Sequence, residues 1–167
     1  MIIISQKPQT IMDHRLDIIL PHKYNSKELS FLLLLLRVII GFLFLKHGLE
    51  KWNNFELLQN TFPDPWGISS RSSLILAIFS ELICSIGFIL GFLFRLATLP
   101  MITTMGVAYF MVHSNDPFAT KELAFIYLVL FLILLITGPG KYSIDYLMGK
   151  ALDSGRNKHS RIRKPIA

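Results

Sequence analysis

Four long runs of apolar residues dominate the chain, and few charges interrupt them. Arg37 lies inside the first run and Glu81 inside the second. The last run gains enough length to cross a membrane, which takes roughly 20 residues, if it begins near Pro117, with Asp116 as its N-cap. A soluble amphipathic helix shows a polar face at every turn, and no such face is visible here. The pattern predicts an all-α, membrane-embedded four-helix bundle with helices at about 29–46, 73–94, 96–112 and 117–138.

The distribution of Lys and Arg predicts the orientation of this bundle. Twelve of the 17 basic residues lie in the N-terminal segment, the second loop and the tail, whereas four lie in the first and third loops. Cytoplasmic segments carry the excess of positive charge, so both termini are expected in the cytoplasm. The expected organisation is an N-terminal cytoplasmic segment (1–28), a four-helix domain (29–148) and a basic cytoplasmic tail (149–167). We therefore expect a multi-pass protein of the cell inner (plasma) membrane.

Composition agrees with a membrane protein. Hydrophobic residues make up 52% of the chain and charged residues 17%, against about 25% charge in a typical soluble domain. The net charge is +6, and with so much lipid-facing surface we expect the lipid bilayer and its anionic headgroups, rather than nucleic acid, as the counterpart. The residues after Asp153 are basic and lack periodicity, which predicts an arm without regular structure.

Burying a charged side chain in a membrane costs free energy, so a charged residue within a span is expected to have a structural or functional role. Arg37 and Glu81 lie at depths that differ by only about 6 Å along the bundle axis, if both helices rise 1.5 Å per residue. Adjacent antiparallel helices would then hold an Arg37–Glu81 ion pair. Such a pair serves either as a structural clamp or as part of a polar pocket, and the sequence leaves both interpretations open.

Further ionisable residues gather toward the outer ends of the predicted helices. Together with Arg37 they form a candidate polar pocket: Arg37, His47, Lys51, Glu81, His113 and Glu122. Taken singly, the terminal residues are typical of side chains that reach for the membrane interface. Taken together, they predict a polar chamber open to the outside, in which histidine suits proton handling. Their spacing matches no metal-binding motif, so no metal is expected, and no catalytic residue is assigned.

Several of these residues occur in a pattern that resembles the DoxX family of membrane proteins. The pattern comprises Arg37, Gly41, Lys46, His47, Gly48, Lys51, Glu81, Gly91, Arg95 and Glu122, followed by the helix-terminating motif Gly138, Pro139, Gly140, Ser143 and Asp145. It departs from the family where Cys84 and Ser85 replace two glycines that often follow the glutamate. Ser143 or Asp145 is expected to cap a short helix along the membrane surface.

The resemblance implies a four-helix bundle and, in some members, a link to quinone-dependent sulfur oxidation or thiol stress. One hypothesis is therefore an oxidoreductase subunit of a quinone- or thiol-linked membrane system, related to oxidative stress. It would have no self-contained redox cofactor, would bind a quinone or a sulfur compound, and would work with a soluble or membrane redox partner. The alternative is a non-enzymatic membrane protein, either a small-solute carrier or an assembly partner of a soluble enzyme. Local motifs name no enzyme class.

Overall fold

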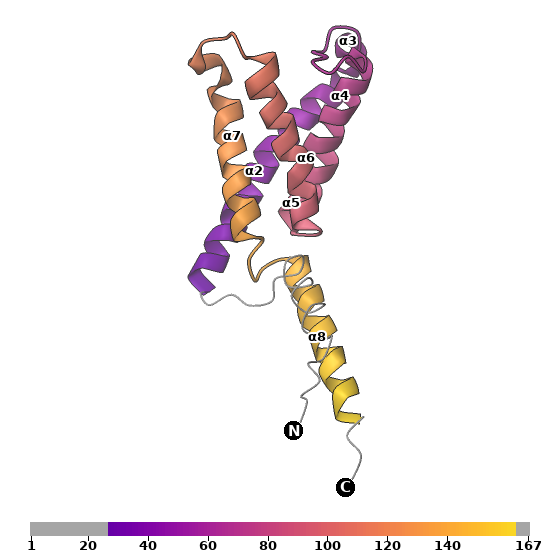
Figure 1. The fold of residues 1–167 in the computed structure, drawn as a ribbon, viewed down its shortest axis with the longest axis vertical. Coiled ribbons are helices and arrows are strands. Elements are labelled where there is room, and N and C mark those ends of the chain that lie inside the picture. Colours follow the sequence, from indigo (N-terminus) through magenta and orange to yellow (C-terminus); the bar gives the residue numbers. More distant parts are fainter. Residues whose placement is uncertain (1–26, 163–167) are drawn as a thin grey trace, which may run out of the picture.

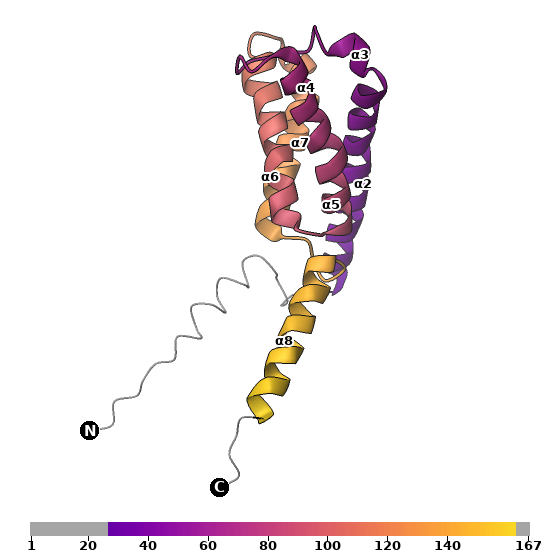
Figure 2. The same ribbon diagram turned by 90° about the vertical axis from the view of Figure 1, so that its right-hand side faces the viewer.

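The computed structural model describes residues 27–162, with side chains up to residue 154. Within this part the chain is all-helical, and four of its helical segments are long and apolar enough to cross a membrane. They bundle together, while a further helix projects from one end (Figures 1 and 2). The protein is therefore a multi-pass membrane protein. The predicted segment 1–28 falls almost wholly outside the described residues.

The first span is the single helix α2 (Lys27–Asn53), followed by the short α3 (Phe55–Leu58). The second span consists of α4 (Ser70–Ile78), the π-helical turn η1 (Phe79–Cys84) and α5 (Ser85–Leu90). The third consists of α6 (Phe94–Val107) and a second π-helical turn, η2 (Ala108–Val112). The fourth is α7 (Phe118–Thr137), and α8 (Ile144–Ile162) follows.

The two ends of the bundle differ in what they carry. The α8 end holds the start of α2, the turn between α5 and α6, and the α7–α8 connection; the α3 end holds α3, the loop to α4 and the α6–α7 loop (Figures 1 and 2). Since α2 begins and α7 ends at the α8 end, the chain enters and leaves the bundle on the same side.

The helices pack around an aromatic core. Phe131 of α7 contacts Phe44 of α2 and Phe88 of α5, with ring centroids 5.0 and 5.5 Å apart, and Phe88 stacks on Phe94 of α6 at 4.9 Å. All four rings are fully buried. Large apolar side chains such as Phe42 and Ile136 point outward and are 62% and 79% exposed. An apolar exterior around an apolar core is what a lipid environment requires.

The C-terminal region differs from the prediction in two ways. The predicted arm without regular structure after Asp153 is wrong, because α8 continues as a helix to Ile162. Arg156, Lys158 and Arg161 after that position are residue types that favour a helix. The predicted short surface helix is also wrong in length and direction, since α8 has 19 residues and projects away from the bundle.

Candidate functional site

A cavity of about 580 Å³ lies between the second and third spans, at the α3 end. One wall is formed by α4 and η1 and the other by α6 and η2, while Lys51 of α2 and the loop before α4 complete it. Both π-helical turns therefore border the cavity. Such turns are rare and frequently occur at functional sites, because the wider turn displaces side chains from their regular helical positions.

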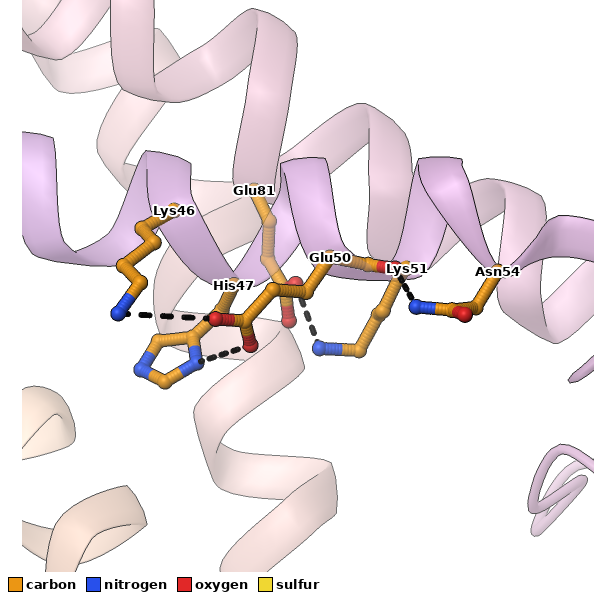
Figure 3. Close-up of polar contacts among 6 residues, drawn as sticks. All are labelled: Lys46, His47, Glu50, Lys51, Asn54 and Glu81. Carbon is orange, nitrogen blue, oxygen red and sulfur yellow. Dashed lines mark hydrogen bonds and ion pairs between the residues drawn. The ribbon is translucent and has the colours of Figure 1, made fainter.

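A buried ion pair forms the polar part of this cavity. The Lys51 Nζ donates a hydrogen bond to the Glu81 Oε2 at 2.7 Å, and Figure 3 shows the two side chains pointing toward one another from α2 and η1. The Glu81 side chain is 2% exposed and that of Lys51 25%. A carboxylate this deeply buried needs a cation, because an unpaired buried charge is strongly destabilising.

The glycine at position 48 brings the two helices close enough for this pair. A Cβ atom at Gly48 would lie 2.8 Å from the backbone carbon of Glu81 and 2.9 Å from the nitrogen of Leu82. Only a residue without a side chain allows α2 and η1 to approach so closely. Lys51 follows three residues later on the same face of α2, which places its ammonium group beside Glu81.

The predicted Arg37–Glu81 pair is wrong. Glu81 pairs with Lys51, and the Arg37 guanidinium binds backbone carbonyls at the opposite end of the bundle. The prediction paired the two charges that interrupt the apolar runs because their estimated depths matched, and it placed Lys51 at the end of the first helix. In the structure α2 continues to Asn53, so Lys51 lies within the span and within reach of Glu81.

His113 stands at the rim of the cavity and is oriented by a carboxylate. It follows η2, whose wide turn closes with a hydrogen bond from the His113 amide to the Ala108 carbonyl at 2.9 Å. Its Nδ1 lies 2.7 Å from the Asp116 Oδ2. The predicted role of Asp116 as a side-chain cap of the fourth helix is therefore wrong: α7 begins at Phe118, Pro117 is its N-cap residue, and no side-chain hydrogen bond caps it.

Besides Arg37, two predicted pocket residues lie away from the cavity. His47 faces α7, where its ring is 6.1 Å from that of Tyr127, and its Nδ1 is 3.8 Å from a Glu50 carboxylate oxygen (Figure 3). Glu122 is exposed on α7. Neither residue lines the cavity. Of the six predicted residues, the structure thus brings together Lys51, Glu81 and His113 around one cavity.

The loop that borders the cavity is fixed by Asp64. The Asp64 carboxylate accepts hydrogen bonds from the Ile68 amide at 3.0 Å, the Ser69 amide at 2.7 Å and the Ser73 hydroxyl at 2.8 Å. Desolvation acts to raise the pKa of Asp64, but the hydrogen bonds from Ser73, Ser69 and Ile68 outweigh it and hold this pKa below its ordinary value. This network joins the loop that carries Trp66 to the start of α4.

Arg37 belongs to a second cluster, at the α8 end. Its Nε donates to the Ile89 carbonyl at 2.9 Å, Nη1 to the Pro139 carbonyl at 2.6 Å and Nη2 to the Tyr142 carbonyl at 2.7 Å. The side chain is almost fully buried. These bonds satisfy one carbonyl in the last turn of α5 and two in the connection between α7 and α8, so Arg37 joins three segments of the chain.

The helix-terminating motif completes this second cluster, which we call the arginine clasp: Arg37, Gly91, Gly138, Pro139, Gly140, Ser143 and Asp145. Ser143 caps α8 by accepting a hydrogen bond from the Tyr146 amide at 3.1 Å. Asp145, the alternative cap, instead accepts the Leu93 and Phe94 amides at 2.8 Å each, at the start of α6. The α7–α8 connection is thereby tied to the turn between α5 and α6.

Sequence reasoning missed two residues that line the cavity and one that contacts a lining residue. Asp116 follows His113 by three residues, a spacing that was readable as a His–Asp contact. Ser80 precedes Glu81 and lines the cavity, yet nothing in the sequence distinguishes it from other helical serines. Trp66 lines the cavity from the loop before α4, whereas its position in the sequence is typical of a tryptophan at the membrane interface.

Comparisons with known proteins identify one matching family and two relatives. The sequence model described as DoxX matches residues 32–114, which include both partners of the ion pair, His113 and Arg37. An uncharacterized protein of Haemophilus influenzae is 35% identical over 126 residues, covering 71% of this chain and 83% of its own. Another uncharacterized protein of that organism is 30% identical over 130 residues, covering 74% and 92%. No solved structure matches the chain significantly.

Proposed function

The chain belongs to the DoxX family, and from this premise we propose that it is a subunit of a membrane redox system that binds a quinone in the cavity between α4 and α6. The observation that carries this proposal is the chemistry of the cavity, which combines apolar walls with one buried ion pair. Electrons would reach the quinone from a soluble or membrane partner enzyme.

The shape of the cavity favours a ligand that arrives from the lipid phase. A volume of about 580 Å³ lies within the range of small-molecule sites, roughly 300–1,000 Å³. Several lining residues are also part of the outer surface: Leu76 and Phe79 on one wall and Leu99 on the other are each 48% or 49% exposed. The cavity is therefore open sideways, between the second and third spans, at residues that face lipid.

The polar groups fit a quinone oxygen. When bound, a quinone supplies two-electron, two-proton carrier chemistry. The Lys51 ammonium uses one of its three N–H groups on Glu81, so it retains donors for a ligand oxygen. Glu81 holds the ammonium group in place. His113, held by Asp116 at the rim, stands where a proton from water can enter the site.

The orientation is part of this proposal. The excess of Lys and Arg at the α8 end supports a cytoplasmic location for both termini and for α8, in the inner (plasma) membrane. The cavity then lies in the outer half of the bundle. A fluorescent protein fused to the C-terminus, of a type that matures only in the cytoplasm, is expected to fluoresce.

A fluorescence titration tests quinone binding directly. The chain has two tryptophans, and Trp52→Phe leaves Trp66, which lines the cavity, as the only one. A benzoquinone with a decyl tail, added to this protein in lipid nanodiscs, is expected to quench Trp66 with a saturable curve. The double substitution Lys51→Met with Glu81→Met is expected to weaken binding by at least about tenfold, since hydrogen bonds to charged groups contribute about 1.5–3 kcal/mol.

Two substitutions outside the cavity serve as controls. His47→Ala and Glu122→Gln are expected to leave the dissociation constant unchanged within about twofold, because neither residue lines the cavity. In cell membranes, quinone reduction should fall with the double variant and persist with both controls. Unsaturable quenching in the wild-type protein, or equal affinity in the double variant, would reject the quinone site and favour the non-enzymatic alternative.

A further inference from the structure

Ser80 lines the cavity, and its buried hydroxyl group has no hydrogen-bond partner among the described residues. The residue is 1% exposed, it lines the cavity, and its Oγ has no partner in the described part of the chain. A buried polar group without a partner costs free energy, so such groups are rare in folded proteins. The Lys51–Glu81 ion pair does not account for this unpaired hydroxyl group, because neither of its members forms a hydrogen bond with the Ser80 Oγ.

Three threonine hydroxyl groups of α6, across the cavity, are satisfied within their own helix. The Oγ1 atoms of Thr98, Thr103 and Thr104 each donate to the carbonyl four residues earlier, at 2.6, 3.0 and 2.9 Å. This is the usual arrangement of Ser and Thr in apolar helices. Ser80 departs from it inside the π-helical turn η1, next to Glu81.

We propose that the Ser80 hydroxyl anchors the cavity ligand by donating a hydrogen bond to an acceptor oxygen, of the carbonyl class. This inference rests on the proposed function and specifies which group holds the ligand in the site. The spare donors of Lys51 and the free hydroxyl of Ser80 together favour an acceptor. A carbonyl oxygen on an otherwise apolar molecule matches both this donor set and the apolar walls.

The protein contains a matched control for this assignment. Ser85 lies in the first turn of α5, is fully buried, and also lacks a hydrogen-bond partner for its Oγ in the described part of the chain. Unlike Ser80, it does not line the cavity. Ser80→Ala and Ser85→Ala therefore remove the same kind of group from the same span, and only the first removes it from the proposed site.

The test uses three probes that quench Trp66 in the Trp52→Phe background. They are the decyl benzoquinone, a chain-brominated decyl ester and a brominated alkane without oxygen, so that a carbonyl from a quinone ring is distinguished from one in a lipid ester. Ser80→Ala is expected to weaken binding of the carbonyl probes by about 3- to 10-fold, the effect of one neutral hydrogen bond. The alkane should bind both proteins equally, and Ser85→Ala should bind all probes like its parent.

Thermal unfolding without ligand separates anchoring from a structural role. Because each substitution removes an unsatisfied buried hydroxyl, both variants are expected to unfold at the same temperature as their parent or higher. Quinone binding that is unchanged by Ser80→Ala overturns the anchor and leaves the quinone site standing. If the ester binds in a way that depends on Ser80 and the quinone does not bind, the anchor is supported and the quinone site is rejected. Failure of both carbonyl probes to bind overturns both proposals. A large loss of stability in Ser80→Ala, without a similar loss in Ser85→Ala, overturns the anchor alone.

Discussion

Replacing Lys51 by methionine removes the cation that faces the buried Glu81 carboxylate. At 2.7 Å between Nζ and Oε2, the attraction amounts to about 6 kcal/mol at an effective dielectric constant of 20. Much of it offsets the desolvation of Glu81, whose side chain is 2% exposed. Losing one partner of a buried pair costs about 3–5 kcal/mol, and we expect this loss of unfolding free energy for Lys51→Met.

The assay is a thermodynamic cycle read by unfolding of the purified protein. Glu81→Met alone leaves Lys51 without its partner but 25% exposed, so its ammonium group reaches water and the cost is smaller, about 1–2 kcal/mol. The double variant replaces the pair by two apolar side chains of similar length. It is expected to be within about 1 kcal/mol of the wild type, because apolar replacement of a buried pair is often neutral or stabilising.

Lys46→Met is the matched control. Lys46 lies 3.8 Å from Glu50 on the same helix, and these side chains are 67% and 57% exposed, so its loss should cost at most about 0.5 kcal/mol. The reasoning would be refuted if Lys51→Met were no more destabilising than Lys46→Met. It would equally fail if the double variant were less stable than Lys51→Met, since relief of the unpaired carboxylate is the core of the argument.

Three further predictions concern the close approaches and the loop. Gly48→Ala is expected to lose about 1–3 kcal/mol of unfolding free energy, because its Cβ would lie 2.8 Å from the neighbouring backbone, whereas Gly106→Ala, with open space around it, should lose none. Gly91→Ala should cost at least about 1–2 kcal/mol, since its φ is +65° and its Cβ would lie 2.6 Å from Ser143; stability equal to the parent contradicts this. Asp64→Asn should lower the melting temperature at neutral pH. The difference should vanish as the pH falls through the depressed pKa of Asp64, because that contribution is present only while the carboxylate is ionised; a constant difference rules this out.

The helical architecture was predictable because every segment that crosses the bilayer must satisfy its backbone hydrogen bonds internally, which a helix does. A run of about 20 apolar residues has few alternatives to a spanning helix, so the four spans and the family resemblance follow from sequence. The orientation of the termini, the division into domains and the roles of the site residues stay predictions. The length of the first helix was not predictable in the same way. The spanning run was predicted to end at about residue 46, yet α2 continues to Asn53.

That extension decided which residues meet. Periodicity places residues on a helix face, but the partner of a buried charge depends on where each helix ends and how closely two backbones approach. Arg37 and Glu81 matched in estimated depth, but Gly48 brings α2 against η1 at the level of Lys51 instead. The π-helical turns were equally invisible, since nothing in an apolar run marks the residue at which an extra one is inserted.

The residues that carry the family resemblance divide between two ends of the bundle with different physical roles. At the α8 end, the Arg37 guanidinium and the Asp145 carboxylate bond to backbone groups, so substitution there is expected to act on folding. At the α3 end, Lys51 and Glu81 bond to each other beside a cavity and retain capacity for a ligand. A substitution in the arginine clasp should therefore lower the amount of folded protein without changing the ligand affinity of what remains. The apolar replacement of the Lys51–Glu81 pair should do the reverse, and this opposition separates the structural part of the motif from the binding part.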